Sequence, residues 1–236
     1  MMYAALWPTM RSPEMVDALA AYPEGMLSAF NYDDVASPQG YLGGAVYGLL
    51  VPLLVAVFAI GWGTRGIAGD EDAGTLDLVL AHPVSRRTVA VQRFAALLTG
   101  VTLVAAVLFV AMLLVRGPFE LGEVTAGGLL AINLHLALFG ACFGALAFAV
   151  GAATGSRAAA LGAGAGAAVL AYLANSVFPQ VEALSWTRTV SPFHWYLGGS
   201  PLTDGVQWAG VGALAAATVV LVAAGTLAFT RRDLTA

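Results

Sequence analysis

The chain has 236 residues, of which 59% are hydrophobic and only 10% are charged. Soluble proteins carry about 25% charged residues, so this composition excludes an ordinary water-soluble domain and favours a membrane protein. The formal net charge of -4 and the lack of a basic run exclude a nucleic-acid-binding surface.

The residue types that the sequence lacks also exclude several kinds of binding site. All ten basic residues are arginine, so the chain lacks the lysine that the phosphate-binding loop of ATPases requires. Cys142 is the only cysteine, which excludes an internal disulfide and a cysteine metal cluster. The histidines are too scattered for a zinc site. We therefore expect no catalytic residue, no metal and no cofactor bound by this chain.

Apolar stretches free of charged residues predict the membrane spans. A helix needs about 20 apolar residues to cross a hydrocarbon core of about 30 Å. The predicted spans are residues 41–63, 94–115, 126–154, 158–178 and 208–229. The runs lack the alternation of a membrane β-barrel. The sequence thus predicts an all-α polytopic membrane protein, with residues 1–236 forming a single domain.

Two features of the spans predict how the helices pack. Glycines at four-residue spacing, such as Gly140 with Gly144 and Gly162 with Gly166, predict close contacts between helices. Pro52 predicts a kink in the first span.

Arginine is distributed unevenly between the segments that join the spans, and basic residues are retained on the cytoplasmic side. The richer side carries Arg65, Arg86, Arg87, Arg93, Arg157, Arg231 and Arg232. Only Arg11, Arg116 and Arg188 fall on the other side. We therefore place the N-terminal segment 1–40 outside the cell, and residues 64–93 and the C-terminus in the cytoplasm.

An exterior segment at residues 1–40 without a secretory signal needs something to carry it across the membrane. Residues 3–7 are apolar, and we interpret them as the end of a helix that begins before Met1. We expect the natural reading frame to start upstream and to encode a sixth span. The alternative is that a short acidic N-terminus crosses unaided.

Residues 64–93 carry a helical pattern of their own between the first two spans. Leu76, Val79 and Leu80 fall at positions i, i+3 and i+4, with Asp77 on another face, so they predict a short amphipathic helix. The acidic run 70–72 precedes them, and we place it at the N-terminal end of this helix, where the dipole favours acids.

The end of this helix and the start of the next are also predicted. Pro83 pushes His82 out of the helical region and ends the first helix. Ser85 caps a second helix that begins near Arg86 and continues into the next span. The residues alone leave two interpretations open, a helix lying in the membrane interface and a cytoplasmic docking helix for a partner protein.

The string from Glu71 to Arg86 resembles the signature E-x-x-GTLE-x-LL-x-x-PVSR of type-2 ATP-binding-cassette (ABC) permeases. The residues that carry this likeness are Glu71, Gly74, Thr75, Leu76, Asp77, Leu78, Leu80, Pro83, Val84, Ser85 and Arg86. A turn at 155–157, a Ser-Pro-Phe segment at 191–193 and an ending at 229–233 extend the likeness over nearly the whole chain.

The resemblance implies a permease subunit of the cell membrane that exports a substrate. A separate ABC ATPase subunit would bind ATP and Mg²⁺, and a second permease copy or a homologue would complete the transporter. It implies a coupling helix at 74–80 with a docking ridge of Leu76, Val79 and Leu80. Glu71 and Arg86 would brace the two short helices against each other. Family members have six spans in each subunit, which agrees with a span missing before Met1.

Two other functions stay open beside this one. The chain is alternatively a membrane anchor or sensor that recruits an ATPase without transport. The second alternative is a lipid-modifying enzyme, in which Asp70, Glu71, Asp72 and Asp77, together with His82, would form a site that binds Mg²⁺ through the carboxylate oxygens.

Polar residues inside the predicted spans are candidates for a transport pathway, because polar groups are costly in lipid. These residues are Asn133, His135 and Asn175. The alternative is that a hydrogen bond between helices explains each of them. Aromatic residues between 186 and 208 are expected to anchor helices at the level of the lipid headgroups.

Overall fold

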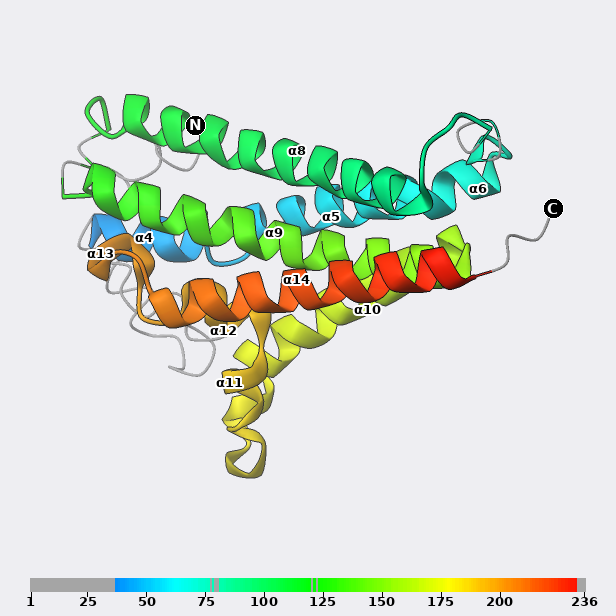
Figure 1. Ribbon diagram of the computed structural model, residues 1–236. Helices are drawn as coiled ribbons and strands as arrows, with labels where there is room; N and C mark the ends of the chain where they lie inside the picture. The colour runs from blue at the N-terminus through cyan, green and yellow to red at the C-terminus, as the bar shows by residue number, and fades with distance from the viewer. Residues whose placement is uncertain (1–36, 77, 79–80, 120, 122, 233–236) are drawn as a thin grey trace. The chain divides into compact units, whose positions relative to one another are not determined.

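A computed structural model of the chain describes residues 37–76, 78, 81–119, 121 and 123–232 (Figure 1). These residues form helices and turns and, within the described part, no strand. Five helices among them are long and apolar enough to cross a membrane: Pro38–Asp72, Arg86–Val115, Ala126–Thr154, Arg157–Gln180 and Trp208–Arg231. Each contains one predicted span, so the all-α polytopic fold is confirmed. The segment 1–40 that we predicted to be exterior lies almost wholly outside the described residues.

The chain divides into two compact units. Unit one comprises the described residues up to Leu54, Val104–Leu136 and Ala171–Val211, and unit two comprises Val55–Leu103, Ala137–Leu170 and the described residues from Gly212 onward. All the arginines predicted to be cytoplasmic belong to unit two, whereas Arg116 and Arg188 belong to unit one. The predicted grouping of the connecting segments is therefore found. A single domain over residues 1–236 stays a prediction.

Unit two is built from parts of the long helices. These are α5 (Leu50–Thr64), α8 (Arg86–Val115), α9 (Ala126–Thr154), α10 (Arg157–Ser176) and α14 (Trp208–Arg231). After α5 the chain continues as a π-helix, η1 (Arg65–Gly69), and a last helical turn, α6 (Asp70–Asp72). Short π-helical stretches are rare and often occur at functional sites.

Glycine lets the helices of unit two approach closely, as their spacing predicts. A side chain at Gly63 would overlap the backbone of Gly144, and a Cβ on Gly144 would lie 2.8 Å from Leu97. The predicted packing role of Gly144 is confirmed. In contrast, a Cβ on Gly162 or Gly166 would meet nothing within 4 Å in the described part of the chain. The spacing alone does not say which glycines face a neighbouring helix.

Unit one begins with α4 (Pro38–Ala45), whose first turn Ser37 caps by accepting the N–H of Gly40 at 3.0 Å. A turn at residues 46–49 then interrupts the first span just before Pro52. The proline ring clashes with the carbonyl four residues earlier in a regular helix, so this interruption confirms the predicted kink.

The segment between α10 and α14 folds into short helices of unit one. They are η2 (Phe178–Gln180), η3 (Glu182–Leu184), α11 (Thr187–Val190), α12 (Pro192–Leu197) and α13 (Pro201–Asp204). Trp186 and Trp208 are exposed, as expected for headgroup anchors. Phe193 and Tyr196 are buried instead, and the Tyr196 hydroxyl donates to the carbonyl of Tyr47 at 3.0 Å. These two aromatic residues therefore belong to the core of unit one.

Candidate functional site

Gly74 and Thr75 of the signature form the end of a helix. The Gly74 N–H donates to the carbonyl of Glu71 at 3.0 Å, and Gly74 has a φ of +66°. The N–H and the hydroxyl of Thr75 both donate to the carbonyl of Asp70, at 2.8 and 3.1 Å. This is the Schellman arrangement, in which glycine takes the left-handed conformation without strain. Helical structure resumes at Leu76, so the prediction that the coupling helix includes Gly74 and Thr75 is wrong.

The acidic run also belongs to the preceding helix. Asp70, Glu71 and Asp72 make up α6, the last turn of the first span, and not the N-terminus of the next helix as predicted. Acids at a helix C-terminus oppose the helix dipole. Ion pairs of Arg93 with Asp70 and of Arg232 with Glu71 offset this cost.

Leu76 lies in the core of unit two, although the helical pattern placed it in a docking ridge. Its side chain is 3% exposed and packs in a cluster with Ile67, Ala90, Phe148, Ala152 and Phe229. Leu76 is thus covered by its own chain and fixes this segment from inside. The amphipathic pattern correctly identified an apolar face but not what covers it.

Leu78 is the most exposed large apolar residue in the described part of this segment, with 67% of its surface accessible against 41% for Val84. Leu78 was not among the predicted docking residues. Three that were, Asp77, Val79 and Leu80, lie outside the described residues. Pro83 falls in the turn after them, where the N–H of Val84 donates to the carbonyl of His82 at 2.7 Å.

Ser85 begins the next helix as predicted. Its hydroxyl accepts the N–H of Thr88 at 3.1 Å, and α8 starts at Arg86. The predicted N-cap is therefore confirmed. It fixes the direction in which the chain enters the second span.

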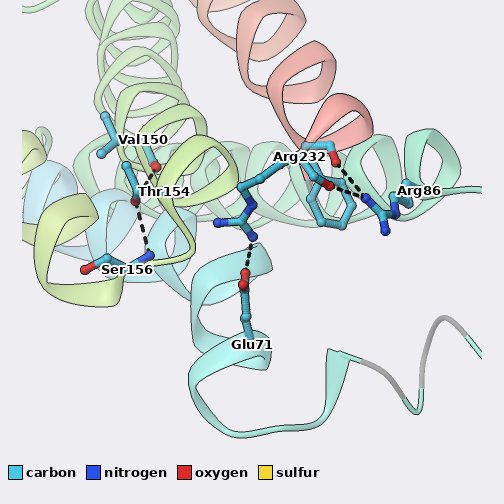
Figure 2. A network of polar contacts seen from close by, with 7 residues as sticks. Glu71, Arg86, Val150, Thr154, Ser156 and Arg232 are labelled. Atoms are coloured by element: carbon cyan, nitrogen blue, oxygen red, sulfur yellow. Dashed lines mark hydrogen bonds and ion pairs between the residues drawn. The ribbon is translucent and has the colours of Figure 1, made fainter. Parts of the chain in front are cut away.

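Glu71 and Arg86 both meet the end of α14, and not each other as predicted. Arg86 donates through Nη1 to the carbonyl of Arg232 at 2.6 Å and to that of Phe229 at 3.4 Å (Figure 2). Its guanidinium lies 5.8 Å from the centre of the Phe229 ring. The carboxylate of Glu71 pairs with the side chain of Arg232 (Figure 2). Two residues of the signature are therefore joined through a residue near the C-terminus.

The contacts of Arg86 satisfy hydrogen-bond acceptors at the C-terminal end of α14. The last carbonyls of α14 have no partner within the helix, and the cation of Arg86 satisfies them where the helix dipole is negative. The side chains of Glu71 and Arg232 are only 20% and 19% exposed. Water and salt therefore screen their attraction less than they would screen a surface pair.

The turn between α9 and α10 completes the site. Gly155 has a φ of +68°, and a Cβ there would overlap Nη1 of Arg232 and lie 2.6 Å from Oε1 of Glu71. The Thr154 hydroxyl accepts the N–H of Ser156 at 3.1 Å and holds this turn (Figure 2). Glu71, Arg86, Gly155, Phe229 and Arg232 are called the helix-end network below.

Sequence reasoning missed Gly155, Phe229 and Arg232 as site residues. Gly155 and Phe229 entered the sequence analysis as parts of the family likeness, and Arg232 also as one of the arginines that set the orientation. The available signal was that all three lie at helix ends on the arginine-rich side, where the signature also falls.

Two acidic residues of the proposed magnesium site are paired with arginines. Asp70 pairs with Arg93 and Glu71 with Arg232. Among the residues that the structure describes, no three His, Cys, Asp or Glu side chains gather as metal ligands. Asp77 lies outside those residues. The contacts disfavour the lipid-modifying alternative.

Asn133 and Asn175 form hydrogen bonds in unit one. The side-chain amide of Asn133 donates to the hydroxyl of Tyr47 at 3.0 Å and to the carbonyl of Leu129 at 2.8 Å. That of Asn175 donates to the hydroxyl of Ser176 at 3.2 Å. The contact with Tyr47 joins the third span to the first, which is the hydrogen bond between helices that forms the alternative to a pathway role.

His135 is fully buried and uses both ring nitrogens. Nε2 accepts the N–H of Gln207 at 3.2 Å, so the ring proton must lie on Nδ1, which faces the carbonyl of Trp195 at 3.2 Å. This neutral ring joins α9 to the segment before α14. A role of Asn133, His135 and Asn175 in a transport pathway stays a prediction.

Comparison with known protein families adds one finding. A model described as ABC-2 family transporter protein matches residues 13–234 of this chain. The match covers the signature and the whole helix-end network. No curated protein and no solved structure matches the chain.

Proposed function

Because this chain belongs to the ABC-2 transporter family, we propose that a separate ATPase subunit docks on residues 73–85 and transmits its movement to the membrane helices through them. These residues are called the coupling segment below. Membership makes the chain a multi-pass membrane permease component of an ABC transporter, a class of protein that works with an ABC ATPase. The proposal concerns where the two subunits meet and how the movement reaches the membrane helices.

One observation carries this proposal: both ends of the coupling segment are tied to the same end of α14. Glu71, just before the segment, pairs with the Arg232 side chain, and Arg86, just after it, holds the Arg232 carbonyl. Leu76 anchors the segment in the core of unit two. A push on the segment would therefore reach the last span and the core together, because Glu71 and Arg86 contact the end of α14 and Leu76 packs in the core.

Leu78 is the proposed contact with the ATPase subunit. It is 67% exposed and lies on the helical turn that follows the signature Gly-Thr. The arginine-rich composition of unit two supports a cytoplasmic location of this segment. By the family likeness, two permease chains and two ATPase subunits form the transporter in the cell membrane, and the direction of transport is export.

Substitution of Leu78 tests the docking contact. An interface hot spot is worth about 2 kcal/mol or more, so Leu78→Asp should raise the Kd for the ATPase subunit roughly 30-fold. Binding is measured with the purified permease in lipid nanodiscs and its ATPase subunit. Leu184→Asp is the matched control, because Leu184 is a 38% exposed leucine of unit one. An unchanged Kd for Leu78→Asp would refute the contact.

Substitution of Leu76 tests whether this residue stabilises the fold or contacts the ATPase subunit. A carboxylate at this buried position has no partner, and burying it costs several kcal/mol. We expect Leu76→Asp to reduce the yield of folded permease in size-exclusion chromatography, whereas Leu78→Asp leaves the yield unchanged. A well-folded Leu76→Asp variant that loses only ATPase binding would restore Leu76 to the docking ridge.

A further inference from the structure

A groove of about 660 Å³ runs between α8 and α14 within unit two. Arg87, Val91 and Phe94 line it on α8, and a stripe at four-residue spacing from Thr218 through Val222 to Thr230 lines it on α14. Ligand pockets measure about 300–1,000 Å³, so the groove is large enough for a lipid chain. It shares no lining residue with the helix-end network.

The groove has the length of one membrane leaflet. From Thr218 to Thr230 the α14 stripe extends roughly 18 Å, at about 1.5 Å per helical residue. Half of the hydrocarbon core measures about 15 Å. Val91 and Leu227, which line the groove, are 52% and 55% exposed, so the described chain leaves its walls uncovered. An acyl chain of one leaflet fits this length and this apolar surface.

Arg87 places a positive charge at one end of the groove. Arg87 is exposed at the start of α8 and has no hydrogen-bond or ion-pair partner in the described residues. Arg86 and Arg93, the other arginines near the start of α8, both have partners. A guanidinium binds phosphate through paired hydrogen bonds. With no carboxylate paired to it in the described chain, the cation favours a lipid of net negative charge.

We propose that this groove binds one anionic phospholipid, with an acyl chain along α14 and the phosphate on Arg87. Anionic lipids are enriched in the cytoplasmic leaflet and are recognised by basic residues between transmembrane helices. The groove is lined by residues of α8 and α14 other than those in the helix-end network. It requires no ATPase subunit, so it can fail or succeed independently of the proposed function.

Lipid retention tests the proposal directly. The chain is reconstituted in vesicles of equal parts phosphatidylglycerol and phosphatidylcholine and is extracted in mild detergent. Mass spectrometry then measures the phospholipids retained by each chain. The native chain should retain phosphatidylglycerol in preference. Arg87→Gln should weaken that retention about tenfold, the effect of losing one charged hydrogen-bonding contact.

The matched control for Arg87→Gln is Arg157→Gln. It removes another exposed arginine at the first turn of a span in unit two, and should leave lipid retention unchanged.

A second pair of variants tests the acyl-chain site. Val222→Trp fills the groove and should lose both lipids, whereas its control Val220→Trp, at a 65% exposed position outside the groove, should retain them. Ala223→Leu is a smaller filling variant that serves if tryptophan prevents folding.

Three results would overturn the proposal. Equal retention in Arg87→Gln and Arg157→Gln would mean that no headgroup site exists at Arg87. Full retention in both filling variants would place the acyl chain elsewhere. A filling variant that changes the oligomeric mass while keeping its lipid would assign the groove to a second copy of this chain.

Discussion

Gly155 is the residue to which the helix-end network leaves least space. Its left-handed backbone conformation costs a residue with a Cβ about 1–2 kcal/mol. A Cβ there would also push against the ion pair of Glu71 with Arg232. The turn between α9 and α10 can therefore approach the pair because position 155 has no side chain.

Substitution of Gly155 by alanine tests whether this position must lack a Cβ. Gly155→Ala should lower the midpoint of thermal unfolding in detergent, because it adds backbone strain of about 1–2 kcal/mol and displaces the ion pair. Gly162→Ala is the matched control within α10, where a Cβ meets nothing within 4 Å in the described chain. There alanine should stabilise the helix by roughly 0.5–1 kcal/mol. A decrease in Gly162→Ala as large as that in Gly155→Ala would remove the steric explanation.

Contacts within a few residues were predictable, and contacts across the chain were not. Ser85 caps α8 through a residue three positions away, so local rules identified it. Glu71 and Arg232 are 161 positions apart. Without knowing which helices pack together, we chose Arg86 as the partner of Glu71, although Arg86 holds the backbone of Arg232.

The coupling segment is an element defined by its two attachments. Its first attachment is the side-chain pair of Glu71 with Arg232, and its second is the hydrogen bond from Arg86 to the Arg232 carbonyl. A second ion pair, Asp70 with Arg93, joins α6 to α8. The Arg93 side chain is 42% exposed and that of Arg232 is 19% exposed, so the two pairs should differ in strength.

Double-mutant cycles measure that difference. Glu71→Gln and Arg232→Gln should show a coupling free energy of about 1–3 kcal/mol in thermal unfolding, because contacting residues in one network are not additive. Asp70→Asn and Arg93→Gln should couple by about 0–1 kcal/mol, because solvent screens the more exposed pair. Equal coupling in both cycles would contradict a special role of the pair on α14.

The sequence predicted the spans better than their ends. A search for charge-free stretches ends the first span at Gly63 and starts the second at Phe94, but the helices continue to Asp72 and begin at Arg86. Charged residues at these ends are paired or lie at helix termini, where charge is tolerated. The same limitation placed the acids of α6 in the following helix. Apolar periodicity likewise placed Leu76 on an outer face, because a period does not identify the surface that covers it.

The all-helical fold of the molecule follows from the free-energy cost of exposing unpaired backbone groups to lipid. Only helices satisfy their own hydrogen bonds in each apolar run, so the fold class and the number of spans in the described chain were predictable. The gathering of arginines in unit two was predictable as well, from their positions between spans. The meeting of the helix ends at Arg232 was not, because pairing among helices depends on packing that no single span encodes.

The labelling of a cysteine at position 78 tests the central claim most directly. Leu78→Cys is made together with Cys142→Ala, which removes the buried native thiol. A membrane-impermeant maleimide should label Leu78→Cys in inside-out vesicles but not on intact cells, and bound ATPase subunit should protect it. Labelling on intact cells, or labelling that the bound ATPase subunit leaves unchanged, would contradict the account.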